Sequence, residues 1–299
     1  MRNQISGVVN LYKEKGYTSF AATEKVKRLF RARKAGHGGT LDPEAEGVLP
    51  ILLGKATKIS TLFLNADKSY RMKILFGVET DTHDLTGQVL RRVEDFHLDE
   101  ERVREALEKF VGTYEQVPPR FSAVKVDGKR AYDLARKGID FDLPAKVVTC
   151  HEATLVSFDG KEAEVFVRCK AGFYLRAMVR DLGEAVGVPA VASHIRREEA
   201  GFMTVDTSLK ISELSEMKRE GRLEEAVRSI DEALSHYPSI RVPDFVKKRV
   251  LVGCPPEEYM PLSPPEGIYK IKDEEENVIA LVKRTGEGRF EYVCVLGES

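Results

Sequence analysis

The stretch GHGGTLDPEAEGVLPILLGKATK (residues 36–58) joins a glycine-rich loop to an apolar run. Its first three glycines permit backbone angles that are closed to other residues and let another molecule approach the main chain. Pro43 restricts Asp42 to extended angles, which fixes the direction of its carboxylate. The pattern therefore predicts either a rigid mount that holds Asp42 at the rim of a cleft, or a structural turn in which Asp42 caps the following segment.

Two other uses of such a loop do not fit its spacing. A P-loop requires GxxxxGK[ST], but the GK at residues 54–55 is followed by alanine. The dinucleotide-binding pattern GxGxxG requires a third glycine where Leu41 stands. His37 and Asp42 have no third or fourth metal ligand at the usual spacing. We therefore expect neither a metal nor a cofactor at this loop.

The composition is typical of a soluble globular protein. The 299 residues are 42% hydrophobic and 32% charged, enough for one large domain or a large and a small one. No apolar run approaches the roughly 20 residues of a membrane span, and no signal-peptide core begins the chain. The four cysteines form no CxxC pair and are expected to pack as apolar residues. These features favour a cytoplasmic protein that does not bind membranes.

The net charge of −1 hides a gradient along the chain. Residues 1–60 carry 11 basic and 5 acidic side chains, whereas residues 201–299 carry 14 basic and 19 acidic ones. A basic N-terminal part is typical of a face that contacts phosphates, although a solvated charged surface would give a similar count.

Hydrophobic periodicity predicts alternating strands and helices. Tyr70 shares the apolar face of one predicted strand, whereas Arg176 lies in the first turn of a helix, off its apolar stripe. Strands are expected at residues 5–11, 70–76 and 161–169, and helices after Thr18 or Ser19, after Asp99, from Arg130 and within residues 173–187.

The last segment has a different character from the rest of the chain. Seven prolines cluster between residues 238 and 265, and three short strands follow at residues 267–273, 277–284 and 289–296. We expect an α+β fold with a small all-β module that begins after Tyr237.

Five motifs resemble the TruB family of tRNA pseudouridine synthases. They follow the family's order across about residues 5 to 200, and they are GHGGTLDPEAEGVLPILLGKATK, ADKSYRMKILFG, DTHDLTG, QVPPRFSAVKVDGKRAYDLAR and AGFYLRAMVRDLG. The resemblance implies the pseudouridine synthase fold in residues 1–237, a mixed and largely antiparallel sheet flanked by helices and loops. It also implies an RNA-contacting insertion at about 115–140 and a PUA-like β domain in residues 238–299.

The resemblance further implies an isomerase that converts the T-loop uridine of tRNA, position 55, to pseudouridine after flipping the base. This reaction breaks the bond from N1 to the ribose, rotates the uracil and rebonds it through C5. No electron or group comes from outside, which agrees with a sequence that has no nucleotide, metal or redox motif. No cofactor is therefore expected.

By the same resemblance, Asp42 is the nucleophile, Arg176 pairs with it, and Tyr70 stacks on the uracil or relays a proton. Taken alone, Tyr70 would be a core tyrosine and Arg176 a surface arginine. The resemblance also places substrate contacts at His37, where the base leaves its stack, and at Lys13, Tyr174 and Ile195.

Several residues depart from the family pattern. Tyr12 and Glu14 replace the usual aspartate and proline around Lys13, and Phe173 replaces a residue that is usually threonine. Two acidic residues, Glu44 and Glu46, stand beside the loop that must meet RNA.

Two alternatives to a stand-alone enzyme share its motifs. One is the catalytic subunit of a guide-RNA-type enzyme, and the other is a tRNA-binding or folding protein without catalysis. A short β module without a basic tail favours the stand-alone enzyme, and the intact Asp42, Tyr70 and Arg176 favour catalysis. The expected partner is the T arm of tRNA, with no obligatory protein partner and a monomeric chain.

Overall fold

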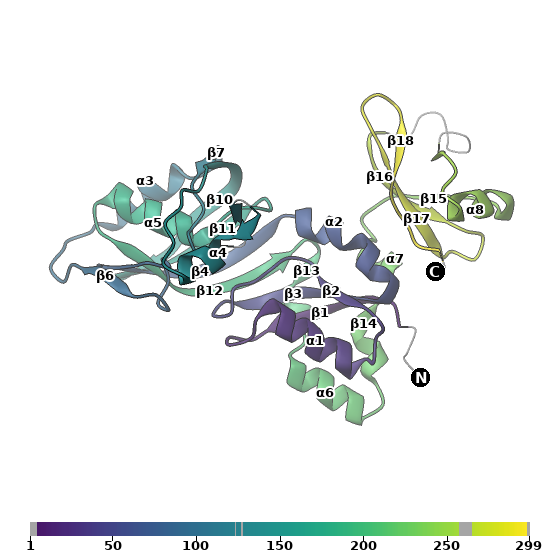
Figure 1. Cartoon of the computed structure of the whole chain (residues 1–299), viewed down its shortest axis with the longest axis horizontal. Helices are drawn as coiled ribbons and strands as arrows, with labels where there is room; N and C mark the ends of the chain where they lie inside the picture. The colour runs from purple at the N-terminus through teal and green to yellow at the C-terminus, as the bar shows by residue number, and fades with distance from the viewer. Residues whose placement is uncertain (1–4, 123, 127, 257–264, 298–299) are drawn as a thin grey trace.

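A computed structural model describes residues 5–122, 124–126, 128–256 and 265–297. Its centre is a ten-stranded sheet with the order β14-β1-β3-β12-β4-β11-β10-β7, to which β2 and β13 add at β3 and β12 (Figure 1). These strands are β1 Gly7–Lys13, β2 Ala35–His37, β3 Glu46–Leu53, β4 Lys68–Phe76, β7 Gly112–Gln116, β10 Lys146–Phe158, β11 Glu162–Cys169, β12 Ala190–Ala200, β13 Met203–Thr204 and β14 Val227–Arg228.

Strand β12 joins the two halves of this sheet. It pairs antiparallel with β4 along most of its length and parallel with β3 through two residue pairs, Arg196 with Glu46 and Arg197 with Gly47. The other named pairings in the sheet are antiparallel. The expectation of a mixed, largely antiparallel sheet is therefore confirmed.

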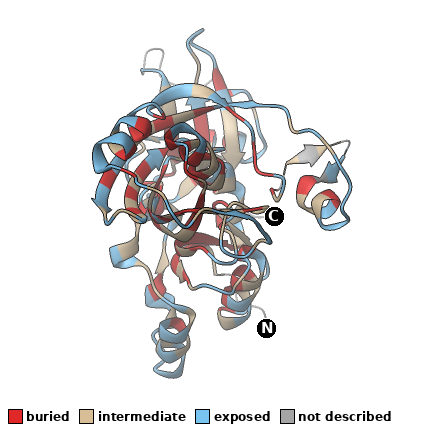
Figure 2. Ribbon diagram, turned by 90° about the vertical axis from the view of Figure 1, so that its left-hand side faces the viewer, coloured by how far each residue is buried: buried red, intermediate tan, exposed pale blue. Residues whose placement is uncertain are grey.

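Helices cover the sheet with apolar faces. Helix α1 begins at the capping residue Thr18, whose hydroxyl accepts a hydrogen bond from the Ala21 N–H. Buried residues line the sheet and the inner sides of the helices (Figure 2). The helices before residue 238 are α1 Ser19–Leu29, η1 Gly54–Ile59, α2 Ser60–Asn65, α3 Glu100–Glu108, α4 Ala131–Arg136, α5 Leu175–Val186, η2 Val205–Thr207, α6 Ile211–Arg219, η3 Leu223–Ala226 and α7 Ile230–Ala233.

The periodic segments form the elements that their patterns predict. Strand β4 buries Met72, Ile74 and Phe76, and α5 buries its whole predicted stripe. Helix α3 begins after Asp99 as expected. Asp99 occupies its N-cap position, but the Asp99 side chain makes no hydrogen bond to the helix. Its carboxylate lies 2.9 Å from His97 Nε2 instead.

Two small hairpins lie outside the main sheet. Strands β5 Val78–Thr80 and β6 Val89–Arg92 form the first, and β8 Lys125–Val126 and β9 Lys129–Arg130 form the second. The second hairpin and α4 belong to the basic segment that follows β7, where a short helix was expected from Arg130.

The C-terminal sheet has the order β15-β16-β17-β18 and stands beside α7 (Figure 1). Its strands are β15 Ser239–Arg241, β16 Gly267–Lys272, β17 Val278–Arg284 and β18 Phe290–Val295, so the three expected strands are confirmed. Helix α8 Asp244–Leu251, which the sequence pattern did not predict, packs its buried Val246 and Val250 in the core of this module. The boundary after Tyr237 stays a prediction. Within the described residues, no helix is both long and apolar enough to span a membrane.

Candidate active site

The loop between β2 and β3 carries Asp42 and is fixed by contacts on both of its sides. The Gly38 N–H donates to the Pro50 carbonyl (2.8 Å). On the α1 side, the Ser19 hydroxyl donates to the Leu41 carbonyl and accepts from the Leu41 N–H (2.9 and 2.8 Å). These bonds satisfy the backbone next to Asp42, so the loop has a defined course before its carboxylate is considered.

The carboxylate of Asp42 points to a guanidinium and not into the turn that follows. Arg176 Nε lies 3.0 Å from Asp42 Oδ2, with the arginine side chain 11% exposed and the aspartate 45% exposed. Within the turn, the Ala45 N–H bonds to the backbone carbonyl of Asp42 (3.1 Å). This geometry favours the rigid mount over a turn capped by the Asp42 side chain.

Three other groups orient Arg176. Its Nη1 donates to the Thr82 carbonyl (3.0 Å) and its Nη2 to the Phe121 carbonyl (2.9 Å). A second carboxylate, Asp84 Oδ2, lies 3.6 Å from Nη1. Because a guanidinium is a planar fork of donors, these partners fix both its position and its plane.

Asp84 is a site residue that the sequence interpretation did not single out. It lies within the DTHDLTG motif, and its Oδ1 accepts hydrogen bonds from the Thr82 hydroxyl and from the N–H and hydroxyl of Thr86. The DTHDLTG motif is the sequence feature that could have pointed to Asp84. Only the fold shows that this motif lies next to Arg176.

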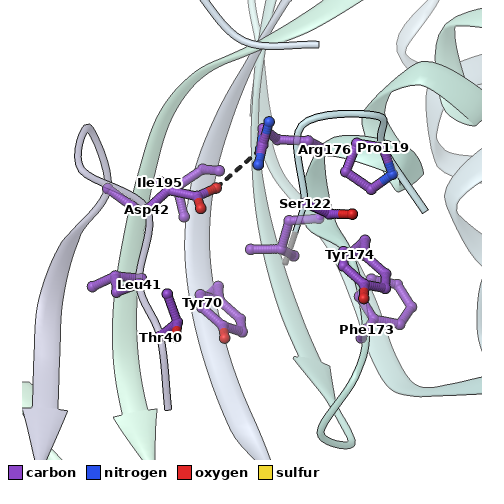
Figure 3. A pocket seen from close by; sticks show the side chains of 12 residues that line it. Thr40, Leu41, Asp42, Tyr70, Pro119, Ser122, Phe173, Tyr174, Arg176 and Ile195 are labelled. Atoms are coloured by element: carbon purple, nitrogen blue, oxygen red, sulfur yellow. Dashed lines mark ion pairs between the residues drawn. The ribbon is translucent and has the colours of Figure 1, made fainter. Parts of the chain in front are cut away.

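A cavity of about 180 Å³ opens beside the Asp42–Arg176 pair. Figure 3 shows Tyr70 and Thr40 on one side of it and Phe173 and Tyr174 on the other. Its walls combine aromatic and aliphatic side chains with a few polar groups, as is typical of small-molecule sites. The lining residues are Thr40, Leu41, Asp42, Ala45, Tyr70, Pro119, Ser122, Phe173, Tyr174, Leu175, Arg176 and Ile195.

The structure brings five of the seven expected site residues to this cavity. Tyr70 reaches it from β4, Ile195 from β12, and Tyr174 from the residue that precedes α5. Burial raises the pKa of Tyr70, while the positive charge of Arg197 acts in the opposite direction. The phenol therefore stays protonated at neutral pH and can donate a hydrogen bond.

The basic segment after β7 also forms part of the wall. Pro119 and Ser122 line the cavity, and the Gln116 side chain bonds to both the N–H and the carbonyl of Tyr174 (3.0 and 3.1 Å). The start of the expected insertion is thus attached to the N-terminus of α5. The basic charge of the segment predicted a contact with RNA, but it did not predict that Pro119 and Ser122 line the cavity.

Lys13 and His37 do not line the cavity. Lys13 is fully buried, and its ammonium donates to the carbonyls of Glu14, Tyr17 and Pro43 (3.2, 2.9 and 3.1 Å). Burial lowers its pKa to about 8, against the opposing effect of the Asp42 charge. Lys13 is therefore held beside the Asp42 loop and not in the cavity wall, and its role as a substrate contact stays a prediction.

His37 lies in β2, opposite Ile51 of β3, and its Nδ1 is a buried atom without a hydrogen-bond partner among the described residues. Burial and the charge of Arg197 lower its pKa. The imidazole is therefore neutral at physiological pH.

Three of the departures from the family pattern, Tyr12, Glu46 and Phe173, have identifiable neighbours in the structure. Glu46 lies 3.3 Å from His194 Nε2. Burial and the negative charge of Glu46 raise the pKa of Tyr12 to about 12, so these two unusual residues act on each other. Phe173 packs edge-on against Tyr114, with ring centroids 6.3 Å apart. In the part of the chain that the structure describes, no group of three His, Cys, Asp or Glu residues could hold a metal ion.

Chains in solved ribonucleoprotein and protein complexes share this fold. A chain in the structure "Crystal Structure of a Cbf5-Nop10-Gar1 Complex" superposes with a TM-score of 0.75 at 23% identity, covering 97% of this chain and 85% of that one. A chain in the archaeal box H/ACA sRNP Nop10-Cbf5 complex gives a TM-score of 0.72 at 21% identity. At such identities the likeness defines the fold class alone.

Sequence comparison gives the family. Residues 27–175 match the model of the TruB family pseudouridylate synthase N-terminal domain. The chain is 38% identical over 257 residues to tRNA pseudouridine synthase B of Bacillus pumilus (84% of this chain, 83% of that protein). It is 41% identical over 250 residues to the protein of that name from Caulobacter sp. strain K31 (83% and 80%). The chain belongs to the TruB family of pseudouridine synthases, as its motifs indicated.

Proposed function

We propose that the protein isomerises the T-loop uridine of tRNA, position 55, to pseudouridine, with Asp42 as the nucleophile. The observation that carries this proposal is the Asp42 carboxylate, held 3.0 Å from Arg176 at the wall of a cavity that Tyr70 also lines. The relatives named tRNA pseudouridine synthase B, which match more than four fifths of the chain, support tRNA as the substrate.

The reaction needs only groups that the chain supplies. The bond from uracil N1 to ribose C1′ breaks, the base turns, and a bond from C5 to C1′ forms. The proton that C5 loses is balanced by one that N1 gains, so the product is an isomer of the substrate. The Asp42 carboxylate forms the transient covalent bond and leaves when the new glycosidic bond closes. Arg176 favours the charged carboxylate and aims it, and Tyr70 stacks on the base or relays the proton. No cofactor takes part in these steps.

The uridine must leave its stack in the folded T loop before it can enter the cavity, at a cost of a few kcal/mol. Aromatic walls at Tyr70, Phe173 and Tyr174 replace the lost stacking. We assign to His37 a contact with the RNA at the point where the base leaves. Ile195 completes the apolar wall.

The basic N-terminal part and the insertion at about 115–140 grip the tRNA arm through phosphates and shape. We further propose that residues 1–237 form the catalytic domain and residues 238–299 a PUA-like domain. The protein acts in the cytoplasm as a monomer without an obligatory protein partner. A guide-RNA-type subunit is the second candidate, but its support is fold likeness at 21–23% identity.

The test is an incubation of the purified full chain with a tRNA transcript tritiated at uracil C5, without guide RNA or added metal. We expect release of one tritium per tRNA, and none above background when the transcript carries cytidine at position 55. Release from other positions, or no release from any tRNA, would contradict the proposal.

A further inference from the structure

Arg197 is a buried cation without an acidic partner. It lies in β12 and is 1% exposed, and no carboxylate of the described residues forms an ion pair with it. A buried charge is expensive unless its hydrogen bonds are satisfied. A charge that is buried at such an expense points to a role beyond packing.

Backbone carbonyls of the Asp42 loop and of the beginning of β3 satisfy this guanidinium. Nη2 donates to Gly39 (3.1 Å), Nη1 to Thr40 (3.3 Å) and Nε to Val48 (2.7 Å). Two of the acceptors precede Asp42 in the chain and the third follows it. One rigid fork of donors therefore holds together both arms of the loop that carries the carboxylate.

The backbone around Arg197 is shaped for this close approach. Gly47, which pairs with Arg197 between β3 and β12, has φ of +106°, and a Cβ there would overlap the Arg197 backbone. Gly39 has φ of +133°, a conformation that side chains rarely adopt. Gly39 and Gly47 allow the backbone to lie close to Arg197. This close approach is a structural reason for glycine at both positions of the motif.

Arg197 also faces Tyr70. The two residues are partners in the β4–β12 register, so their side chains lie on the same face of the sheet. The same residue thus bonds to the loop of Asp42 and neighbours Tyr70 across the strands, where its positive charge opposes the rise of the Tyr70 pKa caused by burial. It lies behind both groups and does not line the cavity.

We infer that Arg197 is a positioning residue for the isomerisation, whose buried guanidinium fixes the Asp42 loop and Tyr70 relative to each other. This inference rests on the proposed role of Asp42. A misplacement of about 1 Å at a reacting group lowers a rate by about 10²-fold, so loss of the fork is expected to act on the chemical step.

The test is the Arg197→Lys variant, which keeps the charge but whose single ammonium cannot reach both arms of the loop. We expect the single-turnover rate constant of tritium release to fall about 10²-fold. The dissociation constant for tRNA, measured by filter binding, is expected to stay within about threefold, because Arg197 does not reach the cavity surface. Arg197→Met serves as a second variant, since it removes the buried charge.

Arg196→Lys is the matched control. Arg196 is the neighbour on the same strand, its side chain is 38% exposed, and it pairs with Glu198 (2.7 Å) on the opposite face. We expect its rate constant to stay within about twofold of the wild type, because exposed pairs contribute little.

The outcomes separate the two proposals. An inactive wild-type protein would contradict the proposed function, whereas an active wild type with an equally active Arg197→Lys variant would overturn only this inference. A parallel loss of rate and tRNA affinity would also overturn it. Loss of cooperative thermal unfolding in both Arg197→Lys and Arg197→Met would overturn the inference as well, because Arg197 would then be needed for the stability of the sheet.

Discussion

Replacement of Arg176 by lysine is the sharpest perturbation of the site. The arginine contacts Asp42 at 3.0 Å and Asp84 at 3.6 Å, and donates to the carbonyls of Thr82 and Phe121. A lysine ammonium cannot make these contacts together from one position. We expect Arg176→Lys to leave Asp42 less firmly held and aimed, while the protein still folds.

The magnitude follows from the contact to Asp42. A hydrogen bond to a charged group contributes about 1.5–3 kcal/mol when it is shielded from water. Arg176 is 11% exposed, but Asp42 is 45% exposed, so solvent screening favours the lower part of that range. At 1.36 kcal/mol per decade, the lower part of the range corresponds to a rate constant lowered about 10- to 30-fold.

The assay is single-turnover tritium release from the tritiated tRNA, with enzyme in excess, so that product release does not contribute. Arg180→Lys is the control, because Arg180 lies one turn further along α5 and pairs with Asp181 (2.6 Å) outside the cavity lining. We expect the control to stay within about threefold of the wild type. An Arg176→Lys rate constant within threefold of the wild type would refute the role of this ion pair.

Two further predictions concern stability. The pKa of His83 is lowered to about 4 by burial and by two nearby arginines, so the unfolded chain takes up its proton first as the pH falls from 6.5. His83 thus contributes stability above pH 6.5 that is lost toward pH 4, at most about 3 to 4 kcal/mol. In urea unfolding at several pH values, His83→Asn should flatten this loss, and an unchanged pH dependence would contradict the assignment. Gly47→Ala should lower the free energy of unfolding by more than about 1 kcal/mol, because its φ is +106° and its Cβ would overlap Arg197. Urea unfolding should show a smaller loss for Gly221→Ala, which has open space around it, and equal losses would contradict the steric reason.

Local periodicity was sufficient to predict the main elements. In β4, the alternation that puts Tyr70 on the apolar face is the one that turns it toward the cavity. In α5, the predicted stripe is buried, which leaves Arg176 on the side that meets Asp42. These predictions succeeded because each depends on residues within one strand or helix.

The contacts that local pattern could not predict join distant segments. Arg197 appears in the sequence as one of two adjacent arginines, and only the β12–β3 pairing shows which of them is buried. Asp84 reaches Arg176 across 92 positions of sequence. Lys13 was expected at the pocket because its motif position suggested a substrate contact, yet its ammonium is saturated by carbonyls. Burial and register, which arise from tertiary structure, decide all three cases.

The central claim is that the Asp42 carboxylate performs the isomerisation. Asp42→Asn keeps the shape of the side chain and removes its charge and nucleophilicity. Measured together on one tRNA, tritium release and binding separate chemistry from recognition. We predict that release falls to background while the dissociation constant for tRNA stays within about threefold of the wild type, because phosphate contacts dominate affinity. Release by Asp42→Asn at a rate near that of the wild type would contradict the account.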